Sequence, residues 1–133
     1  MLFRSQQGAG AIIVTASISS LRGDHSLGAY SASKFAVLGL VESMAKEVAA
    51  KGVRVNCICP GPVEGAMVQG MVESVARGAG RTTDEVLGDL TAPIALGRLV
   101  QPDEVADAAL FLASPLSRFI TGTTVVVDGG MLA

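Results

Sequence analysis

Two residues of the sequence have the types and the spacing needed to move a proton to or from an alcohol. Tyr30 and Lys34 are four residues apart, so on a helix they lie on one face, about one turn from each other. A neutral phenol is a poor base, and a neighbouring ammonium group favours its ionised form. Tyr30 and Lys34 are therefore a candidate pair for acid/base catalysis.

A serine hydroxyl completes this candidate group. Ser17 lies thirteen residues before Tyr30 and closely follows an apolar run typical of a strand. From that position its hydroxyl could hydrogen-bond the same substrate oxygen and stabilise charge that develops there. Ser19 and Ser20 are close enough in sequence to be alternatives. A tyrosine and a lysine at this spacing also occur by chance on solvated helix faces, but the combined spacing of all three residues favours the catalytic interpretation.

The elements that must position these residues alternate between strands and helices. Residues 11–15, 54–58 and 123–127 are short apolar or β-branched runs, typical of strands buried on both faces of a parallel sheet. A helix is expected from about residue 30 to residue 50, because apolar side chains recur there at three- and four-residue steps. Its apolar stripe consists of Phe35, Leu38, Val41, Met44, Ala45 and Val48.

Local signals mark where the helices begin and end. Gly52 suits the C-terminal cap of the helix at 30–50, and Pro102 followed by two acidic residues suits the first turn of another helix. The alternation predicts an α/β fold with a doubly wound parallel sheet. Three strands are about half of such a sheet. We therefore expect residues 1–133 to form a single incomplete domain, the C-terminal half of a Rossmann-type fold.

The composition excludes several classes of function. A net charge of −2 gives no basic field for a nucleic acid or an anionic membrane surface. No apolar stretch approaches the ~20 residues of a membrane helix, and the first residues lack the pattern of a secretory signal, so we expect a cytoplasmic protein. His25, Cys57 and Cys59 are too few to hold a metal ion, and we expect no metal site. The two cysteines are expected to be small buried side chains on one face of a strand.

The spacing of Ser17, Tyr30 and Lys34 resembles the active site of the short-chain dehydrogenase/reductase family. Gly23 falls where many family members have a glycine between the serine and the tyrosine. Other motifs are similar to the family's segment after its sixth strand, its last helix and its closing strand. They occupy residues 56–63, 97–114, 120–122 and 127–130. The resemblance covers nearly the whole chain from about Gly8.

The resemblance implies an oxidoreductase that uses NAD or NADP and transfers hydride between nicotinamide and a secondary alcohol or ketone. Tyr30 is then the acid/base, Ser17 orients the substrate oxygen, and Lys34 favours the phenolate and bonds the nicotinamide ribose. Tyr30 and Lys34 thus also belong to the cofactor site. Backbone groups along the nicotinamide are implied for Pro60, Gly61, Pro62 and Val63. The resemblance also implies a small-molecule substrate and, for a complete enzyme, a homo-oligomer.

The sequence departs from the family pattern in ways that leave alternatives open. The glycine-rich turn that cradles the pyrophosphate, the Asn-Ala-Gly segment and the catalytic asparagine have no counterpart, and Gly65 stands where the family often has a threonine. The chain could therefore be a truncated, catalytically inactive interaction or scaffold module. A non-redox relative is a third possibility, disfavoured because the serine, tyrosine and lysine are all present.

Residues 64–96 match the family's variable substrate-covering region. Residues 82–85 have the form of a capping box that opens a helix. Gly78 and Gly80 could serve as hinges of a lid. An ordinary connection between two helices is the alternative for this region, and nothing in it identifies the substrate.

Overall fold

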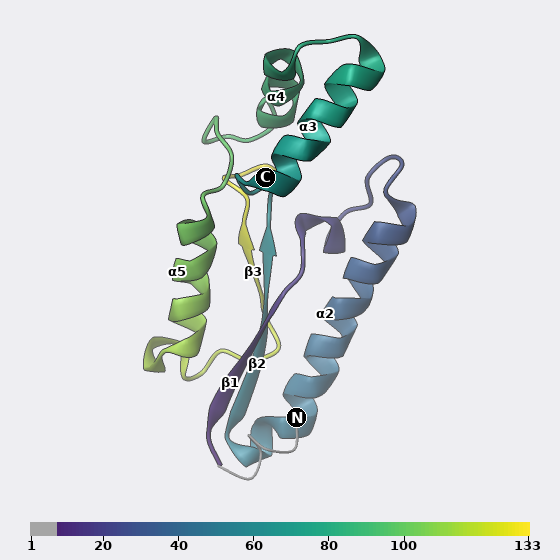
Figure 1. Ribbon diagram of the computed structural model, residues 1–133. Coiled ribbons are helices and arrows are strands. Elements are labelled where there is room, and N and C mark those ends of the chain that lie inside the picture. Colours follow the sequence, from purple (N-terminus) through teal and green to yellow (C-terminus); the bar gives the residue numbers. More distant parts are fainter. Residues whose placement is uncertain (1–7) are drawn as a thin grey trace.

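A parallel sheet of three strands organises the chain in a computed structural model, which describes residues 8–133 (Figure 1). The strands are β1 (Gly10–Thr15), β2 (Val53–Pro60) and β3 (Thr124–Val127), in the spatial order β1-β2-β3. The helices are α2 (Gly28–Val48), α3 (Ala66–Ala79), α4 (Thr83–Thr91) and α5 (Pro102–Ala113), with 3₁₀ turns η1 (Ile18–Ser20), η2 (Ala49–Lys51) and η3 (Pro115–Ser117). The three predicted strands and the predicted α/β class are confirmed.

The register of the sheet brings the carboxyl ends of all three strands to one edge. Thr15 at the end of β1 lies opposite Ile58, and Pro60 at the end of β2 lies opposite Val127 at the end of β3. In parallel sheets this edge is where ligands bind, because the loops that leave it converge there. The central strand is β2, so the segment that follows Pro60 starts in the middle of this edge.

One face of the sheet packs against α2 and forms the main apolar core. Alternate residues of β2 point to this face, as the two-residue repeat of a strand requires. They are Val53, Val55, Cys57 and Cys59, and they pack against Val41, Met44, Ala45 and Val48 of α2. Burial of one such aliphatic side chain is worth about 1.5–3 kcal/mol. The predicted same-face burial of the two cysteines is confirmed.

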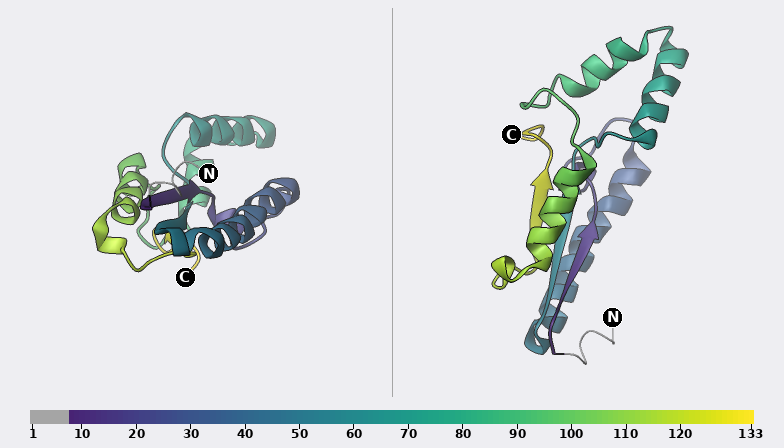
Figure 2. Two further views of the ribbon diagram at one scale, coloured as in Figure 1. Left: turned by 90° about the horizontal axis from the view of Figure 1, so that it is seen from below. Right: turned by 60° about the vertical axis from the view of Figure 1, so that its left-hand side comes forward.

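The other face of the sheet is covered by α5, so helices lie on both faces (Figure 2). The intervening polar residues of β2 reach toward this side. Arg54 donates from Nη2 to the carbonyl oxygen of Leu112 (2.8 Å) near the end of α5, where a cation complements the helix dipole. Asn56 Nδ2 donates to the carbonyl oxygen of Ile120 (2.9 Å), and its Oδ1 accepts from the Thr123 amide (3.2 Å). Both side chains thereby tie the return to β3 onto β2.

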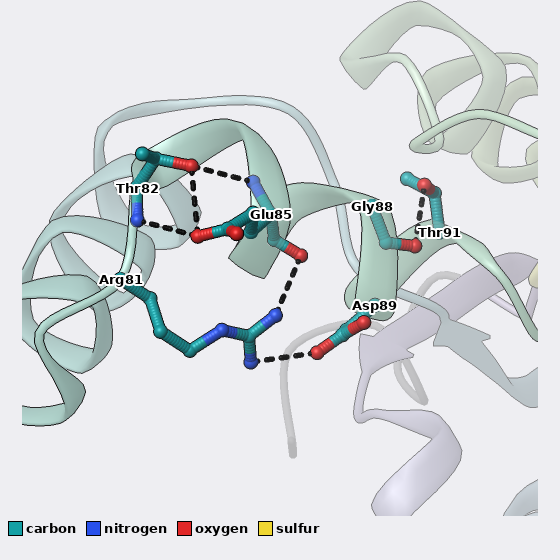
Figure 3. Close-up of polar contacts among 6 residues, drawn as sticks. All are labelled: Arg81, Thr82, Glu85, Gly88, Asp89 and Thr91. Carbon is teal, nitrogen blue, oxygen red and sulfur yellow. Dashed lines mark hydrogen bonds and ion pairs between the residues drawn. The ribbon is translucent and has the colours of Figure 1, made fainter.

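The helices α3 and α4 form a hairpin beyond the carboxyl ends of the strands (Figure 1). It has a small core of its own, built from Val72, Ala76 and Val86 with Val68 and Leu90 packed against them. The predicted capping box is present, because Glu85 N donates to Thr82 Oγ1 (3.2 Å) and Thr82 N donates to Glu85 Oε2 (2.8 Å). Arg81 pairs with Asp89 at 2.8 Å (Figure 3), but both side chains are exposed and such pairs contribute little.

Two details differ from the pattern expected of the sequence. Phe35 was expected in the inward stripe of α2, but 45% of its surface is exposed. It lies ~120° around the helix axis from Val41, on the flank of the stripe. Gly78 lies inside α3, and Gly80 caps that helix in the left-handed conformation (φ 65°), so both glycines lie within the hairpin. The segments at the base of the hairpin are instead residues 61–65, which follow β2, and residues 92–101, which lead into α5.

The C-terminal end of α2 is closed as predicted. After the turn η2, Gly52 takes a left-handed conformation (φ 69°), and a Cβ atom there would clash with the carbonyl oxygen of Gly8. Only glycine fits such an approach. Among residues 8–133, no helix is both long enough and apolar enough to span a bilayer.

Candidate active site

The turn after β1 presents Ser17 at the carboxyl edge of the sheet. Ala16 N donates to the Ile58 carbonyl (2.8 Å), which extends the pairing with β2 one residue beyond β1. Ser17 then caps the 3₁₀ turn η1, and its Oγ accepts a hydrogen bond from Ser19 N (3.1 Å). This bond leaves the Ser17 hydroxyl proton free to donate to a substrate oxygen.

The two alternative serines are less accessible than Ser17. Ser19 is 5% exposed, and its hydroxyl donates to Asp24 Oδ2 (3.2 Å). Ser20 is fully buried, and its hydroxyl has no hydrogen-bond partner among the described residues. Ser17 is half-buried. Of the three hydroxyls, that of Ser17 is therefore best placed to meet a small molecule.

Tyr30 and Lys34 occupy the first turns of α2, against which η1 packs. The Lys34 ammonium lies over the Tyr30 ring, with Nζ 5.6 Å from the ring centroid, a distance typical of a cation–π contact. Tyr30 is 44% exposed. Within residues 8–133, neither the Tyr30 hydroxyl nor the Lys34 ammonium forms a hydrogen bond or ion pair, and none joins Ser17 to Tyr30. Both groups retain their full capacity to bond a substrate or cofactor.

The buried thiol of Cys57 in β2 does not contribute a nucleophile to this group. Burial, followed by the neighbouring Cys59 thiol, raises the pKa of Cys57 to about 12, and the positive charge of Lys34 opposes this rise. The Cys57 thiol is therefore neutral at physiological pH and does not act as a thiolate nucleophile. In the described part of the chain, no group of three or more His, Cys, Asp or Glu side chains could hold a metal ion.

The residues from Pro60 to Val63, which we call the 60–63 segment, are fixed from both sides by backbone hydrogen bonds. Gly61 N donates to the Val127 carbonyl (2.9 Å) on one side. On the other side Val100 N donates to the Pro62 carbonyl (3.0 Å), and Val63 forms a parallel bridge with Val100. Pro60 is buried and the other three residues are half-buried. The 60–63 segment is thus held in place at the centre of the carboxyl edge of the sheet, the same edge at which Ser17 lies.

The loop between Ser17 and Tyr30 contains a feature that the sequence does not reveal. Ser26 has a φ of 65°, the one positive value at a non-glycine residue between residues 8 and 133, and its hydroxyl lies 2.8 Å from His25 Nδ1. Such conformations are uncommon and cluster at functional sites. Residues Ser26 and Asp24 shape this loop, yet no residue type or spacing identifies either of them in advance.

Gly65 stands at the N-cap of α3, where the family often has a threonine. Because glycine has no side chain, this position supplies no hydroxyl and no side-chain hydrogen bond to the cap.

A short-chain dehydrogenase family model, described as "Enoyl-(Acyl carrier protein) reductase", matches residues 2–132. The chain belongs to the short-chain dehydrogenase/reductase family. Diacetyl reductase [(S)-acetoin forming] of Staphylococcus aureus is 37% identical over 129 residues, which are 97% of this chain and 50% of the relative. L-2,3-butanediol dehydrogenase of Corynebacterium glutamicum is 42% identical over 123 residues, which are 92% of this chain and 48% of that enzyme.

Solved structures agree with the sequence relatives. A short-chain dehydrogenase family protein from Francisella tularensis superposes with a TM-score of 0.88 at 30% identity, over 92% of this chain and 50% of its own. The F189W variant of actinorhodin polyketide ketoreductase, with NADPH, also superposes with a TM-score of 0.88. Its identity is 34% over 95% of this chain and 48% of its own. The chain spans about half the length of these family members. The family and the half-Rossmann fold predicted from the sequence are confirmed.

Proposed function

We propose that this chain is the catalytic half of an NAD(P)-dependent oxidoreductase that transfers hydride between nicotinamide and a secondary alcohol or ketone. The observation that carries the proposal is the arrangement of three side chains. Ser17 caps the turn that leaves β1 at the carboxyl edge of the sheet, and Tyr30 and Lys34 are in contact in the first turns of α2, against which that turn packs. The names of the relatives, a diacetyl reductase and a butanediol dehydrogenase among them, support this reaction class.

Each of the three side chains has a distinct task in the proposed reaction. In the reduction of a ketone, the Ser17 and Tyr30 hydroxyls hydrogen-bond the carbonyl oxygen and polarise it. Tyr30 then transfers its proton to that oxygen, and the positive charge of Lys34 stabilises the phenolate that remains. In the oxidation of an alcohol, the phenolate of Tyr30 takes the hydroxyl proton. When bound, the nicotinamide supplies or accepts the hydride.

The residues of this chain fit the nicotinamide end of a dinucleotide. The 60–63 segment is fixed at the centre of the ligand-binding edge, and the Lys34 ammonium has three donors that no described residue uses. We assign Lys34 to the ribose hydroxyls and the 60–63 segment to the nicotinamide. The printed sequence contains no glycine-rich turn for the pyrophosphate. These residues therefore account for one end of the cofactor, and the choice between NAD and NADP lies outside them.

The α3–α4 hairpin is the proposed cover of the substrate. It starts directly after the 60–63 segment and lies beyond the carboxyl ends of the strands (Figure 1). A groove of about 450 Å³ is lined by residues of α3 and α4 and by residues 64 and 65, which precede α3. The groove combines apolar residues (Val68, Val72, Leu87 and Leu99) with acidic ones (Glu64, Glu73 and Asp84). The expected cytoplasmic location and homo-oligomeric assembly stay predictions.

A chimera tests the proposed activity. The first half of the Staphylococcus aureus diacetyl reductase, joined ahead of this chain, should oxidise NADH or NADPH in the presence of diacetyl or a related ketone. Tyr30→Phe in the chimera should reduce turnover by roughly 10²–10⁴-fold, because the transferable proton is lost while the ring remains. An active chimera that keeps more than about half of its rate as Tyr30→Phe would remove Tyr30 from the mechanism.

The second candidate function is a non-catalytic interaction module, favoured by the free edge of β1. Among the described residues β1 pairs only with β2, so its other side can pair with a strand of another chain. A chimera that folds, binds NADPH and yet shows no turnover with any ketone would favour this function over the oxidoreductase.

A further inference from the structure

Asp128 is a buried carboxylate that the proposed reaction does not use. It follows β3 directly and is 7% exposed. Its Oδ1 accepts from Gly130 N and its Oδ2 from Leu132 N, each at 2.9 Å. Neither of the two ion pairs found within residues 8–133 includes it. Its charge is thus stabilised by main-chain amides alone, and these charge-assisted bonds fix residues 128–132, which we call the closing turn.

The closing turn rests directly on the segment that returns from the α3–α4 hairpin. Gly129 and Gly130 have left-handed conformations, with φ of 63° and 83°. A Cβ atom on Gly129 would lie 2.7 Å from Ile94 Cγ2, and one on Gly130 would lie 2.9 Å from Ala95 Cβ. The Gly129 carbonyl also accepts from Leu96 N (3.0 Å). The backbone of the closing turn therefore sets the position of residues 94–96.

Both parts of this junction contact the 60–63 segment. A Cβ atom on Gly61 would lie 3.1 Å from both Cα and Cβ of Asp128, so the two backbones are in close contact. Residues 94–96 continue to Val100, whose amide donates to the Pro62 carbonyl (3.0 Å). The 60–63 segment is thus held directly by the residue that bears the buried carboxylate and indirectly through residues 94–100.

We propose that Asp128 is a positioning residue for the 60–63 segment, acting through the closing turn on Gly61 and on residues 94–100. The proposal rests on the proposed function, in which this segment lies along the nicotinamide. Displacement of about 1 Å at a reacting group costs catalysis heavily, so the segment must be fixed before the cofactor binds. The closing turn also contacts the segment that leaves the α3–α4 hairpin. The closing turn therefore supports both the 60–63 segment and the hairpin.

Hydrogen exchange in the 133-residue chain, without cofactor or substrate, tests this proposal. Asp128→Asn keeps the shape of the side chain but turns one acceptor into a donor that faces a backbone amide. The Gly61, Leu96 and Val100 amides should then exchange at least roughly tenfold faster. The Cys57 amide lies within β2 and donates to the Thr123 carbonyl, and its exchange should change less than about twofold. Asp107→Asn, on the exposed face of α5, is the matched control and should change none of these amides.

Gly61→Ala is a second variant that approaches the junction from the other side. Its methyl group would press on Asp128, so the Leu96 amide should again exchange faster although no residue of the closing turn has changed. Unchanged exchange of Leu96 in this variant would overturn the proposal. Equal acceleration of Cys57 and Gly61 in Asp128→Asn would also overturn it, because the carboxylate would then serve only global stability. Neither result bears on Tyr30, whose role the chimera tests separately.

Discussion

Lys34 Nζ lies over the face of the Tyr30 ring, 5.6 Å from its centroid. The two side chains are in contact through the ring, and the hydroxyl at the ring's edge stays free for a substrate oxygen. The contact follows from the four-residue spacing, because residues one helical turn apart lie above one another on the same face of α2. The ring thus keeps the ammonium at the site before any cofactor is present.

Lys34 is expected to serve both the cofactor and the proton transfer. In the chimera, Lys34→Ala should therefore weaken dinucleotide binding and lower kcat together, whereas Tyr30→Phe should lower kcat and leave binding nearly unchanged. We expect a loss in kcat of roughly 10²-fold or more for the alanine variant. Titration calorimetry with NADPH and steady-state kinetics measure the two effects. If Lys34→Ala retained full cofactor affinity, the assignment of Lys34 to the ribose would be wrong.

Ser17, and not Ser19, should be the serine required for turnover. Ser17→Ala in the chimera removes the hydroxyl that we assign to the substrate oxygen and should reduce kcat by roughly 10²-fold, the usual cost of one lost charge-stabilising donor. Ser19→Ala keeps the backbone amide that donates to Ser17 Oγ and loses only the bond to Asp24, so its effect should be mild. The reverse order of the two kcat values would show that the roles within this turn are misassigned.

The features that the sequence predicted are those that depend on neighbours along the chain. The strands follow from apolar runs, and the Thr82–Glu85 capping box follows from a four-residue pattern. Asp128 and Ser26 could not be found in this way. The importance of Asp128 depends on its contact with Gly61, which is far away in sequence, and the backbone of Ser26 is set by the packing of the loop around it. Phe35 was misplaced because periodicity defines the centre of a stripe better than its flanks.

The isolated 133-residue chain should bind NADH and NADPH weakly or not at all. In the proposed function the 60–63 segment and Lys34 are assigned to the nicotinamide end only, and no glycine-rich turn in the sequence supplies the amide donors that hold a pyrophosphate. Calorimetric titration of the chain with each dinucleotide measures this directly, and the chimera is the positive control. A dissociation constant in the low micromolar range for the isolated chain would show that the phosphate-binding turn is dispensable.

The Cys57 thiol should make the folded chain less stable at alkaline pH. Its pKa of about 12 in the folded state exceeds the ~8.5 of an unfolded thiol, so the folded state holds the proton more tightly. The contribution is complete below pH ~8.5 and is lost between there and about 12, with a slope of at most ~1.4 kcal/mol per pH unit. Urea unfolding from pH 7 to 10 should show a shallower decline for Cys57→Ala than for the wild type. Parallel declines would mean that Cys57 makes no such contribution.

The free edge of β1 should make the isolated chain self-associate. Residues Ile12, Ile13 and Val14 are apolar and half-buried, and in the described part of the chain β1 pairs on one side only. Its backbone donors and acceptors on the other side are a template for pairing with a second copy. Ile13→Lys places a charge on this strand and should suppress association, which light scattering across a concentration series measures.

Leu116→Lys is the matched control, because Leu116 is 76% exposed and lies in η3, away from the edge. If Leu116→Lys suppressed association and Ile13→Lys did not, exposed helical surface and not the β1 edge would be the cause. A monodisperse monomer at high concentration would refute the prediction altogether.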